Sequence, residues 1–278
     1  MTGYAITLSS PLARALLGIV ALAVALFLIV PVLVIVPLSF SSGSFLSFPP
    51  PGFSLRWYQQ LFSRSDWMDS AWLSIWIACL VALLSTVLGT AASFGLVRGK
   101  FPGQRLLVAF ILSPLIIPGI IVAIAVYFFY ARLQLVGSPI AIAVAHTALA
   151  VPFVVVNVSA SLHGFDKRLE MAAQNLGAGA FDTFRLVILP SIRPGVIAGA
   201  LFAFITSFDE LIVALFIAGP SQVTLPLRMW ESMRSSLEPT LAAVSTLAVV
   251  ASVSLFLCAS WLQRRAQAGA GRMVREGA

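Results

Sequence analysis

The sequence predicts an all-α membrane protein with six membrane-spanning helices, and this rests on composition and on the length of its apolar stretches. Hydrophobic residues make up 60% of the chain and charged residues 10%, whereas a soluble domain carries roughly 25% charged residues. A bilayer core about 30 Å thick requires roughly 20 apolar residues of helix. Residues 1–278 are therefore expected to form one transmembrane domain. The six spans are residues 14–38, 70–97, 106–130, 139–162, 195–218 and 241–262.

The first apolar stretch is interpreted as a retained span and not as a cleaved signal peptide. It stays apolar for longer than the roughly 7–15 residues of a signal-peptide core, and no A-x-A cleavage signal follows it. Residues 39–69 then form the longest external segment. Ser39–Gly52 is rich in serine and proline and is not expected to be regular helix. Residues 54–62 have helical spacing of apolar residues, with Ser54 as N-cap and Trp57 and Tyr58 as interfacial anchors.

Prolines interrupt the first, third and fourth spans. These prolines are expected to kink their helices, which a bundle tolerates because neighbouring helices bond the freed carbonyls. They are Pro31, Pro37, Pro114, Pro118 and Pro152. Cys79 and Cys258 fall in predicted spans, where packing is a simpler role than a disulfide. The sequence has no C-x-x-C pair or other metal-ligand spacing, so no metal site is expected.

The distribution of positive charge predicts the orientation of the chain. Cytoplasmic segments of membrane proteins are enriched in Lys and Arg. Twelve of the 17 Lys and Arg residues lie before span one, between spans two and three, between spans four and five, or after span six. Both termini and the segment 163–194 are therefore predicted to be cytoplasmic. Because topology explains the net charge of +7, no nucleic-acid partner is expected.

The cytoplasmic segment 163–194 contains two predicted short helices. Asp166 is a suitable N-cap for a helix over residues 169–176, and Gly177 can end that helix in a left-handed conformation. A second helix is expected over residues 180–187, ended by Pro190.

This segment resembles a known motif. The run Leu169–Ala178, followed by Val187–Pro190, resembles the EAA loop of bacterial ABC importer permeases. In that family two small residues and a glycine precede an I-x-L-P turn and form a coupling helix that docks on the ATPase. Met171 occupies the glutamate position of the motif, with Glu170 one residue earlier. The positions in register are Ala172, Ala173, Gly177, Ile188, Leu189 and Pro190.

The resemblance implies the fold of a type I ABC importer transmembrane domain in the bacterial inner membrane. ATP and Mg would be bound by a partner ATPase homodimer, and this chain would need no cofactor. It has no G-x-x-x-x-G-K-[ST] loop, since Gly99-Lys100 is followed by Phe101. No catalytic residue is therefore expected. The residues implied in coupling are Glu170, Met171, Ala172, Ala173, Leu176, Gly177, Ala178, Phe181 and Pro190.

A second resemblance concerns the substrate. Residues 207–210, 219–220, 224–227 and 238–239 look like the second permease subunit of spermidine/putrescine importers. Such importers pair two different permeases with an ATPase dimer and a periplasmic binding protein. The resemblance implies uptake of a small organic cation, a polyamine above all. Related permeases for aminophosphonates, amino-acid-like or opine-like compounds and oxyanions remain alternatives.

Asp209 and Glu210 are the charged pair inside the fifth span. They would lie roughly 22 Å along a helix that starts at the cytoplasmic side, where ionisable groups face a partner or an aqueous cavity. With Phe208 they are candidates for the substrate pathway, and a buried contact between helices or subunits is the alternative. An ion-coupled secondary transporter with Asp209, Glu210 and His146 as a proton relay is a third interpretation, but it leaves the EAA-like loop unexplained.

Overall fold

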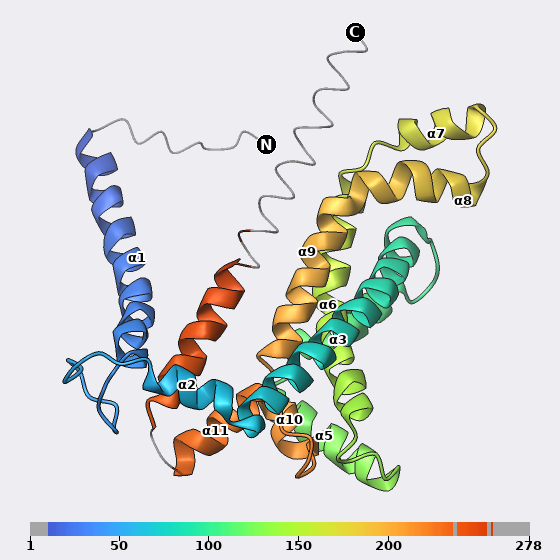
Figure 1. Ribbon diagram of the computed structural model, residues 1–278. Helices are drawn as coiled ribbons and strands as arrows, with labels where there is room; N and C mark the ends of the chain where they lie inside the picture. The colour runs from blue at the N-terminus through green and yellow to red at the C-terminus, as the bar shows by residue number, and fades with distance from the viewer. Residues whose placement is uncertain (1–10, 236–237, 255–256, 258–278) are drawn as a thin grey trace. The chain divides into compact units, whose positions relative to one another are not determined.

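The computed structural model describes residues 11–235, 238–254 and 257, and the regular elements in these residues are helices (Figure 1). One isolated antiparallel bridge joins Ser41 and Phe53. The all-α prediction is thus confirmed for the described part of the chain. Contacts divide the chain into two units, residues 1–63 with 232–250 and residues 64–231 with 251–278.

The first unit contains α1 (Pro11–Ser39) and α2 (Arg56–Ser63). The hydroxyls of Ser39 and Tyr58 lie 2.7 Å apart and connect the end of α1 to α2. The helix expected over residues 54–62 is confirmed, and Ser54 Oγ accepts a hydrogen bond from the Arg56 amide at 3.1 Å. The side chain of Trp57, which was expected to anchor this helix at the membrane interface, is buried in the protein.

The second unit is built on α3 (Ser65–Arg98), α6 (Pro139–His163) and α9 (Leu189–Phe208), which pack against one another. Small residues allow this close approach. A Cβ added at Gly89 of α3 would lie 2.6 Å from Val154 Cβ, and one added at Gly195 of α9 would lie 2.7 Å from the carbonyl oxygen of Asn157. The core between these helices is apolar and includes Ile77, Val81, Ile142, Val158 and Ile192.

The third predicted span is strongly bent. It consists of α4 (Gln104–Leu112), the 3₁₀ turn η1 (Ser113–Leu115) and α5 (Gly119–Arg132). Its two halves meet at 101°, a larger change than the expected kink. Pro118 has an extended backbone, with φ −54° and ψ 129°, and cannot donate an amide hydrogen bond, so the helix restarts at Gly119.

The fifth predicted span differs most from expectation. A helix runs without a stop from Ala180 to Phe208, through α8 (Ala180–Thr183), the π turn η2 (Phe184–Ile188) and α9. The prediction that Pro190 ends a short helix is therefore wrong. The amide of Leu189 bonds the carbonyl of Phe184 five residues back, and this wider turn makes room for the proline ring.

Beyond Phe208 the helix breaks and resumes as α10 (Ile212–Ile217), so the predicted span 195–218 is not one helix. The remaining named helices are α7 (Lys167–Asn175) and α11 (Leu225–Ser235). Within the second unit, α7 and α8 lie at one end of the bundle, and α5 and α10 lie at the other (Figure 1).

Four described helices are long and apolar enough to cross a membrane, and the bent pair makes five if it counts as one span. They are Arg14–Ser39, Ser65–Arg98, Pro139–His163 and Ala180–Phe208. Of the sixth predicted span, residues 240–254 form a shorter apolar helix. Residues 255–256 and 258–262 of that span, with Cys258, lie outside the described residues.

Candidate functional site

The helix α7 begins as the sequence predicts, at an N-cap aspartate. Asp166 has extended backbone, and its carboxylate accepts a hydrogen bond from the Arg168 amide at 2.9 Å. This side chain satisfies an amide that the first turn of a helix leaves without a partner. The helix starts at Lys167, two residues before the predicted start.

The end of α7 is a tight glycine turn. Gly177 has φ +87°, a left-handed conformation that side chains with a Cβ adopt rarely. Its amide donates to the Gln174 carbonyl at 2.9 Å, and the Ala178 amide donates to the Ala173 carbonyl at 3.0 Å. This pair of bonds is the Schellman arrangement, so the glycine position of the EAA-like motif is also the position that stops the helix.

Apolar side chains are exposed on and next to α7, at the end of the bundle where it lies with α8 (Figure 1). α7 buries none of its residues. Leu176 keeps 89% of its surface exposed and Phe181 keeps 70%, and Met171 and Leu186 are exposed as well. Exposed apolar side chains at this end of the bundle, next to several charged residues, are candidates for contact with a partner protein. We call Leu169, Met171, Leu176, Phe181 and Leu186 the apolar arm surface.

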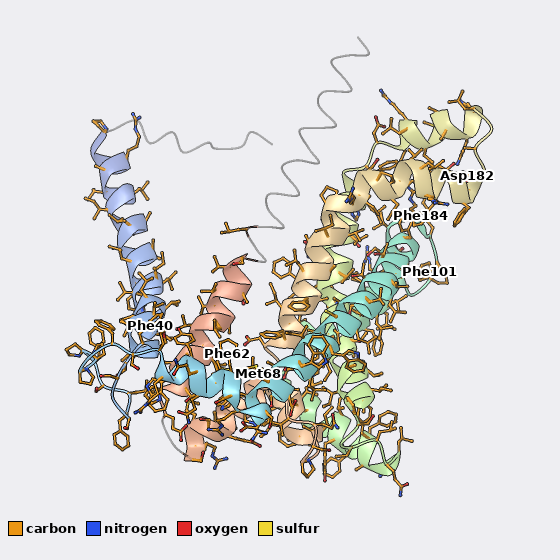
Figure 2. The ribbon with its side chains drawn as sticks, viewed as in Figure 1. Phe40, Phe62, Met68, Phe101, Asp182 and Phe184 are labelled. Atoms are coloured by element: carbon orange, nitrogen blue, oxygen red, sulfur yellow. The ribbon has the colours of Figure 1, made fainter. Side chains whose placement is uncertain are left out.

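The residues that the motif nominates for coupling are not all equally accessible. Met171, Ala172, Leu176, Gly177, Phe181 and Pro190 are exposed, and Ala173 and Ala178 are half-buried. Glu170 points at its own chain, with its carboxylate 2.7 Å from Arg98 Nη1 at the end of α3. In Figure 2, Asp182 lies toward the far end of α8 and Phe184 lies closer to the bundle.

Asp209 and Glu210 lie in the break between α9 and α10, at the opposite end of the second unit from α7 (Figure 1). Their expected placement on a continuous helix is wrong, because α9 ends at Phe208. Glu210 Oε1 accepts a hydrogen bond from the Val213 amide at 2.9 Å and so caps the start of α10. Asp209 is exposed, and within the described residues its carboxylate has no ion pair or hydrogen bond. The Phe208 ring stacks on that of Phe204 at 5.9 Å.

His146 is buried between α6 and α9. Its Nδ1 lies 3.1 Å from the Ser207 hydroxyl, which agrees with a packed, hydrogen-bonded imidazole. No hydrogen bond among the described residues connects His146 to Asp209 or Glu210, so the structure shows no relay between them. The described residues also hold no group of three or more His, Cys, Asp or Glu suited to a metal ion.

A cleft that the sequence did not suggest lies at the start of α3. Its volume is about 680 Å³. Asp66 and Asp69 line it one helical turn apart, with Trp72 and Trp76 further along the same helix. Asp66 is paired with Arg64 at 2.8 Å. The sequence spacing shows that these α3 side chains are neighbours on one helix. It does not show that residues 220–223 line the other side of the cleft.

Comparison with known proteins establishes the family. Residues 85–270 match the family of inner membrane components of binding-protein-dependent transport systems. This chain belongs to that family. The permease is 34% identical to the putrescine transport system permease protein PotI of Escherichia coli K12. The alignment of 248 residues covers 87% of this chain and 88% of PotI. The permease is also 30% identical to the spermidine/putrescine transport system permease protein PotC of Haemophilus influenzae, over 86% of this chain and 93% of PotC.

The fold of the permease agrees with solved structures. The structure of a bacterial ABC transporter that imports the polysaccharide alginate superposes with a TM-score of 0.66, at 15% identity, over 95% of this chain and 98% of the other. At that identity the likeness concerns the fold alone. The resemblance to ABC importer permeases is therefore confirmed, both in sequence and in fold.

Proposed function

We propose that this permease forms one half of a heterodimeric pore in an ATP-driven importer of polyamines, putrescine or spermidine. The observation that carries the proposal is the similarity to PotI and PotC over nearly the whole chain. The exposed carboxylate of Asp209 suits the same substrate class, because a polyamine carries several positive charges. The role of Asp209, Glu210 and Phe208 in the substrate pathway remains part of this proposal.

The proposed topology has six spans with both termini in the cytoplasm of a bacterium, and the chain crosses the inner membrane. The end of the second unit that carries α7 holds Arg98, Lys100, Lys167 and Arg168, which supports a cytoplasmic position for it. The break with Asp209 and the cleft with Asp66 would then face the periplasm.

The proposed partners bind at the two opposite ends of the second unit. An ABC ATPase homodimer, which binds ATP and Mg, docks on the apolar arm surface, and a periplasmic binding protein delivers substrate at the opposite end. The permease itself contributes no cofactor and no catalytic group. Closure of the ATPase dimer displaces α7 and α8 and shifts the bundle between outward-open and inward-open states, each favoured by a different ligand condition.

Reconstitution in proteoliposomes tests the proposal. The permease is combined with the ATPase, second permease and binding protein from neighbouring genes, and uptake of labelled putrescine is measured with and without ATP. We expect uptake that requires ATP and the binding protein, and that is lost with an ATPase unable to hydrolyse ATP. Uptake driven by an ion gradient without ATP would overturn the importer mechanism. ATP-dependent uptake of another solute, without uptake of putrescine or spermidine, would overturn only the assignment of the substrate.

A further inference from the structure

The guanidinium of Arg98 holds α7 to the rest of the second unit. Arg98 is the last residue of α3, and its Nη1 lies 2.8 Å from Oε1 and 2.7 Å from Oε2 of Glu170 on α7. The two residues are 72 positions apart in the sequence. Because the side chains retain only 27% and 20% of their surface exposed, the pair is shielded from water more than an ordinary surface ion pair.

Aromatic rings fix the position of the guanidinium. It lies 5.3 Å from the ring centre of Phe94 on α3 and 5.8 Å from that of Phe165, which precedes α7. A cation near the face of an aromatic ring is attracted to it, and a side chain held in this way loses less freedom when it forms an ion pair. The rings thus hold the Arg98 guanidinium in the position from which it pairs with Glu170.

The aromatic rings also connect Arg98 to the π turn between α8 and α9. Phe94 meets the ring of Phe184 edge to face at 5.2 Å, and Phe184 begins the π turn between α8 and α9. Figure 2 shows Phe184 where α8 passes the end of α3. All three rings are partly buried against the main apolar core. We call Arg98, Phe94, Phe165, Phe184 and Glu170 the Arg98 cluster.

This contact links α7 to α3, whereas the other contacts of α7 are with its neighbours in the chain, α8 and η2. The helix buries none of its residues, so apolar burial does not fix its position on the bundle. A helix attached only by its two chain ends would tilt when a partner pushes it. With Glu170 bonded to Arg98, a displacement of α7 acts on the end of α3, whose other face packs on α6 and α9.

We propose that Arg98 is a positioning residue of the transport cycle, which transmits movement of α7 to α3 through Glu170. The inference rests on the proposed function for the direction of the force, but the contact itself belongs to this chain. It also assigns Glu170 a role different from docking. The motif's glutamate position holds Met171, and the carboxylate one residue earlier serves as an internal link instead of a contact to the ATPase.

The test uses the complete reconstituted transporter and four variants. Glu170→Ala removes the ion pair, and Glu170→Arg places two like charges together. The double variant Arg98→Glu with Glu170→Arg restores opposite charges. Lys100→Ala is the matched control. Arg98, Glu170 and Lys100 all line one cavity of about 390 Å³. Lys100 is exposed and, among the described residues, forms no ion pair.

Two quantities are measured, the ratio of polyamine imported to ATP hydrolysed and the hydrogen exchange of the α7 amides. In Glu170→Ala we expect the ratio to fall by about fivefold or more, which is the lower end of known couplings between sites. Exchange over residues 167–175 should become roughly fivefold faster, because one charge-assisted bond is lost. Glu170→Arg should be worse, the double variant should recover in part, and Lys100→Ala should match the unmodified protein.

An unchanged ratio and unchanged exchange in Glu170→Ala would overturn the proposal. So would a double variant no better than Glu170→Arg alone. Hydrogen exchange is measured without substrate, so an error in the substrate assignment would leave that result standing. If Glu170→Arg fails to assemble with the ATPase, Glu170→Ala and Lys100→Ala still decide the question, because neither introduces a like charge.

Discussion

Gly199 on α9 lies directly against Val154 on α6, so that a Cβ added at Gly199 would sit 2.9 Å from the Val154 Cα. Gly89 on α3 approaches the same valine from another helix. Val154 is fully buried, and the three helices that carry the second unit therefore meet around one side chain. The helices can approach this closely because neither Gly89 nor Gly199 carries a Cβ.

Replacing Gly199 by alanine should destabilise the permease. The added methyl meets backbone and not the end of a movable side chain, so α6 and α9 must separate, and overpacking of this kind costs about 1–3 kcal/mol. Thermal unfolding of the purified complex, followed by tryptophan fluorescence, measures the loss. Gly95→Ala on α3 is the matched control: nothing lies within 4 Å of its new methyl, and alanine favours helix over glycine by up to about 1 kcal/mol. Equal effects from both changes would contradict the close-packing argument.

Ser74→Ala should be destabilising and Ser85→Ala should not. Ser74 Oγ accepts a hydrogen bond from the Leu225 amide at 2.7 Å, in a buried position at the start of α11. Removing it leaves a buried amide without a partner, at a cost of about 1–3 kcal/mol. Ser85 lies on the same helix and is fully buried, but its hydroxyl has no partner among the described residues. Its removal should leave the unfolding temperature unchanged or higher, and a drop as large as that of Ser74→Ala would show an unseen partner.

Gly177→Val should impair coupling while Gly177→Asn should retain most of it. The residue needs φ +87°, which valine opposes because of its branched Cβ and which asparagine tolerates. No atom lies within 4 Å of a Cβ at this position, so the effect is due to backbone strain and not to a clash within the chain. ATP-dependent uptake and co-purification with the ATPase are the measurements. Full uptake with valine would mean that the end of α7 does not need this turn.

Asp209→Asn should reduce uptake of a polyamine, and Glu210→Gln should have a smaller effect. The Asp209 carboxylate is exposed and available to a cation, whereas Glu210 is already bonded to the Val213 amide, and the glutamine oxygen can accept the same bond. Initial uptake rates at several putrescine concentrations separate the two variants. If both variants transport normally, the pair has a structural role and the pathway assignment fails.

The sequence was sufficient for the membrane class, the family and the two ends of α7. Each depends on neighbouring residues: lengths of apolar stretches, the small residues Ala172 and Ala173, the Asp166 cap and the Gly177 turn. The prediction failed at Pro190 and at Asp209, where it assumed that a proline stops a helix and that an apolar stretch continues one. Whether the helix continues at Pro190 or ends before Asp209 depends on the backbone conformation of the turns next to each residue.

The sequence also shows that this chain has no G-x-x-x-x-G-K-[ST] loop, and the proposed ATPase partner rests on that observation and on the family. Only the tertiary structure decided the partner of Glu170, the 101° bend after α4 and the contact between His146 and Ser207. These features join residues that are far apart in the chain. Spacing along a sequence reports which side chains share a helix face, but the pairing of two helix faces is decided by the packing of the whole bundle.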